Sequence, residues 1–502
     1  MGTTATGGVR AFFLVGLIAC AQTASDGDQN QAAALSPPPE WDRAVVRPTD
    51  ETLASTSRQR CAFKRGAMPA ETLGAELPVD AAIPIQTVVV LMQENRSFDS
   101  YLGHLGRYAN RTDIESARED TTNPERVSDP SSPQHAWKHA PRLCFPDTNH
   151  TWAGNHVELG NGTNNGFFEA NQGFTEVANA DPQYLSGERA LWWYNERDIP
   201  FYYELASTFA IGDHYFGSLL GPTYPNRDFL YGATSRGMAG NHTLDIKGLD
   251  FPANNLLIFD ELERRGIPWG VYVSAVPHVP RVAAFLGVTF AARWPGDHFH
   301  FLSTFYDDAK AGRLPPVVFV DANINEDHRG EDEHPPADVQ IGQKFVSDVT
   351  HALFKSPQWG SLALFITYDE HGGLYDHVTP PPACKPDDIA PDLEGDDAAW
   401  PGAFDRLGFR VPFIVVSPFA KRAYVSHKTY DHTSITRFIE TKFKLPALSN
   451  RDANAEPLFD FFDFEGRPFA TPPAISVPPV DSAKLAECDS LFGAQQDPGN
   501  ER

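Results

Sequence analysis

The sequence predicts an α/β protein, a three-layer α/β/α sandwich with a mainly parallel central sheet. Unbroken apolar runs of strand length recur along the chain, as expected for strands that are covered on both faces. Segments with apolar residues at helical spacing alternate with these runs, which is typical of a sheet with helices on both sides. The chain has 502 residues, 41% of them hydrophobic, so it can bury a large core.

The folded body opens with a strand in "IPIQTVVVLMQ", residues 83–93. Residues 104–190 show little periodicity and are rich in turn-forming residues, which indicates long loops and short elements. Further strands are expected at 267–273, 314–322, 361–369 and 411–418. Helices are expected in the first part of 199–216, before an extended end, and at 256–266, 340–356 and 433–443, the last with Thr433 as N-cap.

The N-terminal residues predict an export signal. Arg10 precedes the apolar run from Ala11 to Ala19, which is too short to span a bilayer. The end of this run, "LIAC", resembles the bacterial lipoprotein box, in which the chain is cut before the cysteine and a lipid is attached to its sulfur. An ordinary secretory signal cleaved nearby is the alternative. We therefore expect an exported protein with a lipid anchor at Cys20, at the bacterial cell envelope, facing the periplasm or the surface.

The domain organisation expected from these patterns has four parts. Residues 1–19 are the lipoprotein signal peptide, and 20–80 are a tether with an N-terminal extension. Residues 81–490 form the main domain, and 491–502 form a C-terminal tail.

Beyond Cys20 the chain has four cysteines without CxxC spacing, which argues against a zinc knuckle: Cys61, Cys144, Cys384 and Cys488. In an exported chain an even number permits two disulfides, with three possible pairings, although free buried thiols are also possible.

The charge balance excludes one class of partner. Lysine and arginine total 41 and the acidic residues 66, which gives a net charge of −25. So negative a surface repels nucleic acid and anionic membranes, and no nucleic-acid partner is expected.

Polar side chains follow two of the expected strands. Glu94 and Asn95 come directly after the strand that ends at residue 93, and Asp369 and Glu370 end the strand at 361–369. Ligands of open α/β sheets bind at the carboxyl ends of the strands. Three carboxylates and an amide at that edge predict a site for one divalent metal ion, with Ca, Mg, Mn, Zn and Fe all remaining as candidates. Ion pairs with arginine are the alternative explanation of the acidic pair.

A hydroxyl and several histidines complete the candidate site. Thr223 stands between turn-forming residues in "GPTYPNRDF", residues 221–229, where it is placed to act as a nucleophile. Histidines in loops near element boundaries can hold phosphoryl oxygens or protonate a leaving group: His150, His334 and His432. His371 either supports its own loop through hydrogen bonds or takes part in the site directly.

The motifs together resemble a known family. The segments "VVVLMQENRSFDSYLG", "GPTYPNRDFLYGATS", "ITYDEHGGLYDHVTPP" and "YDHTSITRFIE", with "EHPPADVQIG" between the second and third, occur in the order found there. They are similar to the bacterial phosphoesterase family of phospholipases C and acid phosphatases, within the alkaline-phosphatase-like superfamily. The resemblance runs from about residue 84 to 445.

The resemblance implies an alkaline-phosphatase-like fold with one metal-centred site and a phosphate ester, with phospholipid as the leading candidate, as substrate. The metal ligands would be Glu94, Asn95, Asp369, Glu370 and Thr223. Thr223 would also be the nucleophile and form a phospho-threonine that water hydrolyses. The pocket and substrate residues would be His150, His334, Asn226, Arg227, His371 and His432.

Two departures from the family pattern bear on the substrate. A Gly-rich stretch that usually follows "SYLG" in the phospholipases is replaced by "HLGRYANRTDIES", and "NNGFF" stands for the family's "MDGF". Phospholipase C-type diester cleavage is therefore the leading expectation, with an acid phosphatase as the alternative. A non-catalytic surface lipoprotein is a third hypothesis. A sulfatase is disfavoured because no "CxPxR"-type motif is present.

Overall fold

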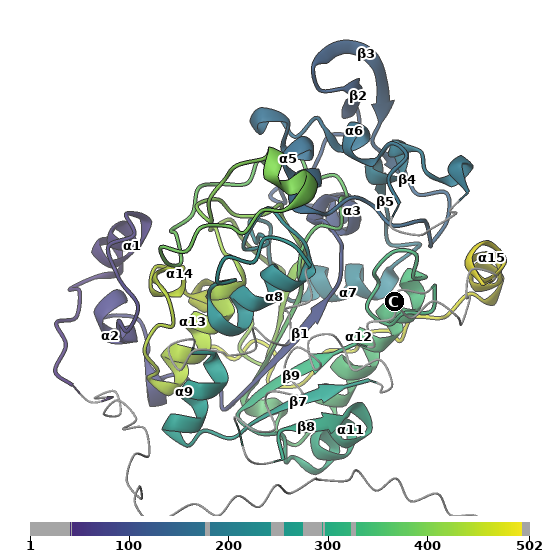
Figure 1. Ribbon diagram of the computed structural model, residues 1–502. Helices are drawn as coiled ribbons and strands as arrows, with labels where there is room; N and C mark the ends of the chain where they lie inside the picture. The colour runs from purple at the N-terminus through teal and green to yellow at the C-terminus, as the bar shows by residue number, and fades with distance from the viewer. Residues whose placement is uncertain are drawn as a thin grey trace, which may run out of the picture. The chain divides into compact units, whose positions relative to one another are not determined.

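The structure, a computed structural model, describes residues 41, 43–175, 181–241, 256–274, 294, 297–322 and 328–493 (Figure 1). The predicted signal peptide, the anchor residue Cys20, the polar part of the tether and most of the predicted tail lie outside the described residues. Within the described part, no helix combines the length and apolar character needed to cross a membrane.

An eight-stranded sheet occupies the centre, in the order β12-β6-β11-β10-β1-β9-β7-β8. Its strands are β1 (Thr87–Gln93), β6 (Ala210–Gly212), β7 (Trp269–Val273), β8 (Phe299–Phe301), β9 (Val317–Asp321), β10 (Leu362–Tyr368), β11 (Phe413–Val416) and β12 (Tyr424–Ser426). Neighbouring strands run parallel except at β11, which is antiparallel to both β10 and β6. The predicted mainly parallel sheet is confirmed.

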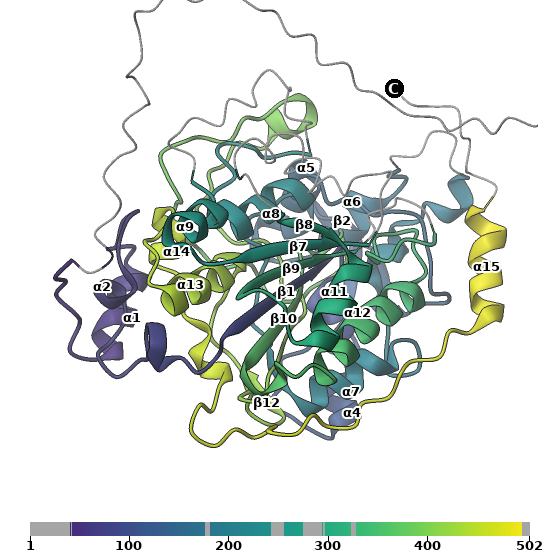
Figure 2. The same cartoon turned by 90° about the horizontal axis from the view of Figure 1, so that it is seen from below.

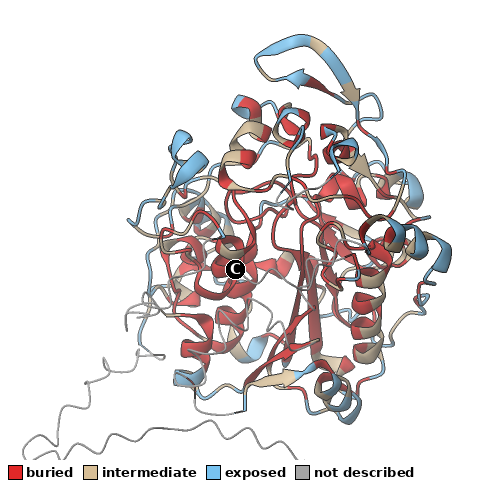
Figure 3. Ribbon diagram, turned by 45° about the vertical axis from the view of Figure 1, so that its right-hand side comes forward, coloured by how far each residue is buried: buried red, intermediate tan, exposed pale blue. Residues whose placement is uncertain are grey.

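The two central strands are covered on both faces, as their unbroken apolar runs predict. Every residue of β1 and β10 is buried, and Figure 3 shows the strands in the buried colour. The strands pair in parallel from Thr87↔Leu362 to Gln93↔Tyr368. Because this register keeps their ends level, the residues that follow β1 emerge beside those that follow β10.

Helices cover both faces of the sheet (Figures 1 and 2). One layer contains α7 (Pro200–Thr208), α11 (Leu302–Ala311) and α12 (Val339–Phe354). The other contains α8 (Thr223–Gly232), α9 (Ile258–Arg265) and α13 (His432–Phe443). The predicted three-layer arrangement is confirmed. The predicted N-cap of α13 is wrong, because the side chain of Asp431 caps this helix by accepting from the Thr433 N–H. An aspartate two residues earlier competes successfully for the same role.

Short elements surround these layers, as the low periodicity of residues 104–190 predicts. Between β1 and α7 lie α3 (Phe98–Leu102), α4 (Leu105–Ala109), β2 (Thr122–Arg126), β3 (Asp129–Ala136), β4 (Lys138–His139), α5 (Trp152–Leu159), α6 (Phe167–Asn171) and β5 (Trp192–Trp193). At the two ends of the described chain lie α1 (Glu51–Gln59), α2 (Pro69–Thr72), α14 (Asn450–Ala453) and α15 (Ser482–Phe492). The part of the N-terminal extension that is described is thus folded.

Two disulfides tie distant parts of the chain together. Cys61 bonds to Cys384 and Cys144 to Cys488, which selects one of the three possible pairings. The first bridge fixes the extension to the body beside the ion pair of Arg58 with Glu456 (2.8 Å). The second fixes α15 to the segment that follows β4.

Candidate functional site

The residues after β1 and β10 meet at one edge of the sheet. The N–H of Asn95 donates to Asp369 Oδ1 (3.1 Å), and the N–H of Arg96 donates to the carbonyl of Glu370 (3.1 Å). Asn95 has φ 61°, a left-handed conformation that asparagine tolerates better than most residues. All four predicted ligands from these strand ends are at most 2% exposed. The structure therefore brings Glu94, Asn95, Asp369 and Glu370 together in a buried cluster.

Three oxygens of this cluster are left open. Asn95 Oδ1, Asp369 Oδ2 and Glu370 Oε1 are buried and accept no hydrogen bond from any described residue. Leaving a buried carboxylate oxygen without a partner costs free energy, and a bound cation is one means of removing that cost. Carboxylate and amide oxygens are also the ligands that hard divalent ions prefer. The donor set therefore fits the implied metal ion.

An arginine compensates part of the negative charge of this cluster. Arg227, from α8, lies 3.0 Å from Glu94 Oε1, 3.3 Å from Asp321 Oδ1 and 3.5 Å from Asp369 Oδ2. The alternative of arginine pairing thus holds for Asp369 but not for Glu370, which has no arginine partner among the described residues. Burial raises the pKa of Glu94 to about 7, although the charge of Arg227 opposes this shift.

Asn226, the neighbour of Arg227, holds the loop that precedes α8. Asn226 Oδ1 accepts from the N–H groups of Ser218 and Leu219, and its Nδ2 donates to the carbonyl of Gly221 (2.8 Å). These bonds fix the loop that leads into Thr223, the first residue of α8. Thr223 is 5% exposed and stands one helical turn before Arg227, so both are on the same face of α8.

His150 and His334 lie beside each other next to the oxygen cluster. Their ring centroids are 5.5 Å apart, and His150 Nε2 is 3.4 Å from Asn95 Nδ2. The Nδ1–H of His150 donates to the carbonyl of Thr148 (2.7 Å), which leaves Nε2 as the acceptor.

Sequence reasoning missed Asp147, which joins these two histidines. Its carboxylate lies 3.7 Å from His150 Nδ1 and 4.0 Å from His334 Nε2, and the three side chains form a group that can hold a metal ion. Burial lowers the pKa of His334, but the charges of Asp147 and Glu94 outweigh it, so the pKa is raised. The spacing of Asp147 three residues before His150 was the available signal.

His371 and His432 lie behind the cluster. His432 Nε2–H donates to the carbonyl of Asp369 (2.6 Å), and its Nδ1 accepts from the Tyr215 hydroxyl (3.2 Å). His371 faces Glu158 through Nε2 (2.8 Å) and Glu370 through Nδ1 (3.3 Å). Protein groups engage both ring nitrogens of each histidine, so both rings are placed to orient Asp369 and Glu370. For His371, this is the loop-supporting role that the sequence allowed as one of two possibilities.

A second buried cluster, which the sequence did not reveal, lies around Arg410. Asp99, Asp376 and His377 form another group that can hold a metal ion. Here Arg410 donates to Asp99 Oδ1 (3.0 Å) and Asp376 Oδ1 (2.8 Å), and His377 Nδ1 lies 2.6 Å from Asp99 Oδ2. Backbone N–H groups bind further, including that of Asp99 to Asp376 Oδ2 (3.2 Å). Every carboxylate oxygen in this cluster has a partner.

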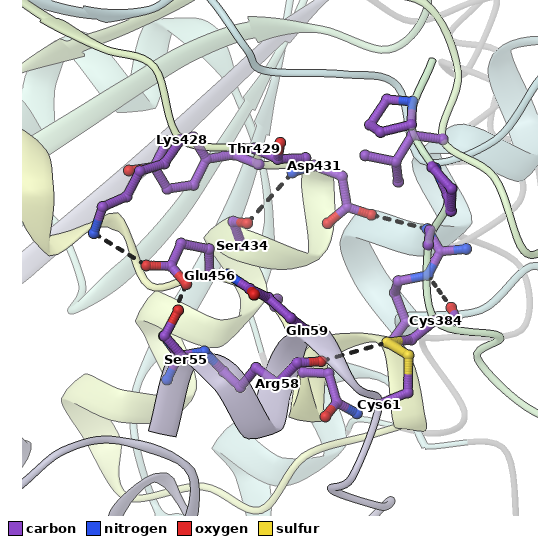
Figure 4. A pocket seen from close by; sticks show the side chains of 18 residues that line it. Ser55, Arg58, Gln59, Cys61, Cys384, Lys428, Thr429, Asp431, Ser434 and Glu456 are labelled. Carbon is purple, nitrogen blue, oxygen red and sulfur yellow. Dashed lines mark hydrogen bonds and ion pairs between the residues drawn. A yellow bond between two sulfur atoms is a disulfide. The ribbon is translucent and has the colours of Figure 1, made fainter. Parts of the chain in front are cut away.

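A pocket of about 520 Å³ lies beside the Cys61–Cys384 bridge (Figure 4). Arg58, Lys428, Asp431 and Glu456 are among its lining residues, and none of the predicted site residues lines it. Its described cations are engaged by carboxylates, as in the pairs Lys428–Glu456 (3.2 Å) and Arg451–Asp431 (3.2 Å). The pocket therefore has no spare positive charge that favours a phosphate group.

Comparison with known proteins agrees with these motifs. Residues 85–446 match the Phosphoesterase family. The chain belongs to the Phosphoesterase family. As a family member it is a phosphoric ester hydrolase, as the sequence predicts.

Two relatives of this phosphoesterase have names that include an activity. Non-specific phospholipase C6 of Arabidopsis thaliana is 34% identical over 400 residues, covering 75% of this chain and 72% of the relative. Phospholipase C B of Mycobacterium tuberculosis (strain CDC 1551 / Oshkosh) is 29% identical over 442 residues, covering 80% and 82%. A solved protein in the alkaline phosphatase superfamily from Vibrio parahaemolyticus aligns with 79% of this chain and 96% of its own, at 11% identity and a TM-score of 0.32.

Proposed function

We propose that this phosphoesterase is a metal-dependent phosphodiesterase of the phospholipase C type, with Thr223 as nucleophile. The observation that carries the proposal is the set of three buried oxygens on Asn95, Asp369 and Glu370 that accept no hydrogen bond from the described residues. The names of the relatives support a phospholipid-like diester as substrate.

The cation would be held by these three residues together with Glu94 and Thr223. When bound, it supplies positive charge that stabilises an ionised hydroxyl and the phosphoryl oxygens. Asn226 and its bonds to the preceding loop hold Thr223 at the start of α8, and Arg227 neutralises part of the surrounding acidic charge.

Catalysis then proceeds in two transfers. The Thr223 hydroxyl gives its proton to His150 Nε2, the nitrogen left as acceptor, and its Oγ1 forms a bond to phosphorus while the bond from phosphorus to the leaving alcohol breaks. The leaving oxygen takes a proton from His334, whose pKa is raised by its acidic neighbours. Water then attacks the phospho-threonine and gives one proton to His334, and the released Thr223 oxygen takes back the proton held by His150 as the phosphorylated head group leaves.

The deciding experiment compares para-nitrophenyl phosphorylcholine with para-nitrophenyl phosphate, with and without EDTA. We expect faster cleavage of the diester and its loss in EDTA. Faster cleavage of the monoester would favour the acid phosphatase alternative, for which the site has the same nucleophile and acidic pair. Absence of turnover of both substrates together with absence of bound metal would overturn the proposed metal-dependent phosphodiesterase.

We also propose that the protein is exported and lipid-anchored at Cys20, on the strength of the "LIAC" sequence. Expression in a bacterium with labelled palmitate should label the wild-type protein and leave Cys20→Ser unlabelled. Labelling of the variant would rule out the anchor.

A further inference from the structure

We propose that Glu158 is a positioning residue of the metal site: it holds His371 against Glu370 and so keeps one oxygen of Glu370 directed at the cation. This inference rests on the proposed function, since it assigns Glu158 a role toward the same ion. Neither the sequence motifs nor the family resemblance points to Glu158.

The chain of contacts is short and buried. Glu158 Oε2 lies 2.8 Å from His371 Nε2, and His371 Nδ1 lies 3.3 Å from Glu370 Oε2. Glu158 and His371 are 0% and 1% exposed. With a carboxylate at each ring nitrogen, the ring of His371 cannot turn without losing both contacts.

The two oxygens of Glu370 are treated differently by the protein. Oε2 is held by His371 and also accepts from the N–H of Gly372 (2.8 Å). Oε1 is one of the three oxygens of the site that accept no hydrogen bond. Fixing the first oxygen sets the rotation of the carboxylate group, and the second is thereby directed to the cluster. Protein groups that orient ligands in this way typically change metal affinity by about 10- to 100-fold when they are removed.

A second contact fixes Glu158 from its other side and leads to the segment that carries His150. Asn171, the last residue of α6, donates through Nδ2 to Glu158 Oε1 (3.0 Å). Its Oδ1 accepts from the N–H of Asn149 (2.7 Å), the residue before His150. Through these contacts, Glu158 on α5 and Asn171 on α6 connect Glu370 with the segment that precedes His150.

A purely structural role does not account for this arrangement. Burying a carboxylate without an arginine or lysine is costly, and Glu158 has neither among its described partners. An apolar side chain at this point of α5 would avoid that cost and would leave His371 and Glu370 without an anchor. The burial of a polar, ionisable group here is explained if orientation of Glu370 is what it provides.

The test is a titration of the EDTA-stripped full chain with Mn²⁺ alone, in which free Mn²⁺ is followed by electron paramagnetic resonance. We expect Glu158→Gln to raise the Kd for Mn²⁺ about 10-fold or more. Glu158→Ala should raise it further if the variant folds, and the Gln variant decides if it does not. The matched control is Glu261→Gln, which alters another buried carboxylate, on α9, and should leave the Kd unchanged.

Thermal unfolding separates orientation from folding. The Glu158→Gln variant should keep the wild-type melting temperature within a few degrees, and excess Mn²⁺ should restore most of its kcat. An unchanged Kd in this variant overturns the inference while leaving the metal site intact. A wild-type protein that binds no Mn²⁺ overturns both the inference and the proposed metal dependence.

Discussion

Two buried clusters of carboxylates in this phosphoesterase differ in one respect, which is whether their oxygens are satisfied. Around Arg410, each oxygen of Asp99 and Asp376 accepts a bond from the guanidinium, a histidine or a backbone N–H. At the ends of β1 and β10, Asn95, Asp369 and Glu370 each keep one buried oxygen without a hydrogen bond. The first cluster is closed and the second is open.

This difference separates a structural cluster from a candidate site. Both groups contain the residue types that bind metals, so composition alone does not distinguish them. In a closed cluster, every carboxylate oxygen is already compensated by a donor from the protein. An open cluster carries a desolvation cost that a ligand relieves. The contrast predicts that substitutions in the open cluster impair activity, whereas those in the closed cluster impair folding.

The largest expected effect is that of removing the proposed nucleophile. Thr223→Ala should lower kcat for the diester on the order of 10⁴-fold or more, because it removes the oxygen that would form the covalent intermediate. Bound metal per chain and melting temperature should stay close to wild type. Full activity in this variant would show that the nucleophile is a different group.

Breaking the closed cluster should affect stability most. Arg410→Met leaves Asp99 and Asp376 buried without their cation, which we expect to lower the free energy of unfolding by about 3–5 kcal/mol. Urea denaturation measures this loss. Metal content per folded molecule should be unchanged, and a variant that loses metal but keeps its stability would contradict the distinction between the clusters.

Removing one charge from the open cluster should weaken metal binding without unfolding the chain. Asp369→Asn removes one negative charge from the ligand set, and we expect its Kd for Mn²⁺ to rise about 10- to 100-fold. The measurement is metal content after dialysis against graded chelator. If the variant retains as much metal as the wild type, Asp369 is not a ligand.

The smallest expected effect concerns Glu261, a buried carboxylate that belongs to neither cluster. Glu261 also has a buried oxygen without a hydrogen bond, and Arg264 is its ion-pair partner (2.7 Å). Burial raises the pKa of Glu261 to about 7, with Arg264 opposing the shift. A carboxyl with a raised pKa binds more protons in the folded state, so stability falls as pH rises from about 4.5 to about 7.

Glu261→Gln should remove this pH dependence. Relative to wild type, its free energy of unfolding should improve between pH 5 and pH 7.5, by about 2 kcal/mol or less. Urea denaturation at the two pH values measures the change. An equal response of both proteins would show that Glu261 ionises normally when folded.

The sequence predicted the open cluster better than the closed one, for a physical reason. Glu94 with Asn95 and Asp369 with Glu370 directly follow strands whose apolar runs are local signals, and the rule for parallel strands places their ends together. Asp99 and Arg410 are paired across 311 positions, between a five-residue helix and an irregular segment, which no periodicity reports. The pairing of the cysteines was undetermined for the same reason.

The side chains behind the site show the same limit. The motifs gave His371 and His432 as substrate residues, but which way a ring faces depends on neighbours such as Glu158 and Tyr215 that come from other elements. Asp147 and Glu158 stand in segments of weak pattern. The residues at strand ends can thus be predicted from the sequence. The groups that orient their side chains come from other elements and are seen only in the three-dimensional structure.

The two disulfides have a consequence for proteolysis. Their spans overlap, since one joins Cys61 to Cys384 and the other joins Cys144 to Cys488. A single cut anywhere between Cys61 and Cys488 therefore leaves the two fragments joined by at least one bridge. Nicked molecules would migrate as full-length chains until a reductant is added. A molecule built this way keeps both halves of the candidate site after a single cut, because β1 and β10, which precede Asn95 and Glu370, stay covalently connected.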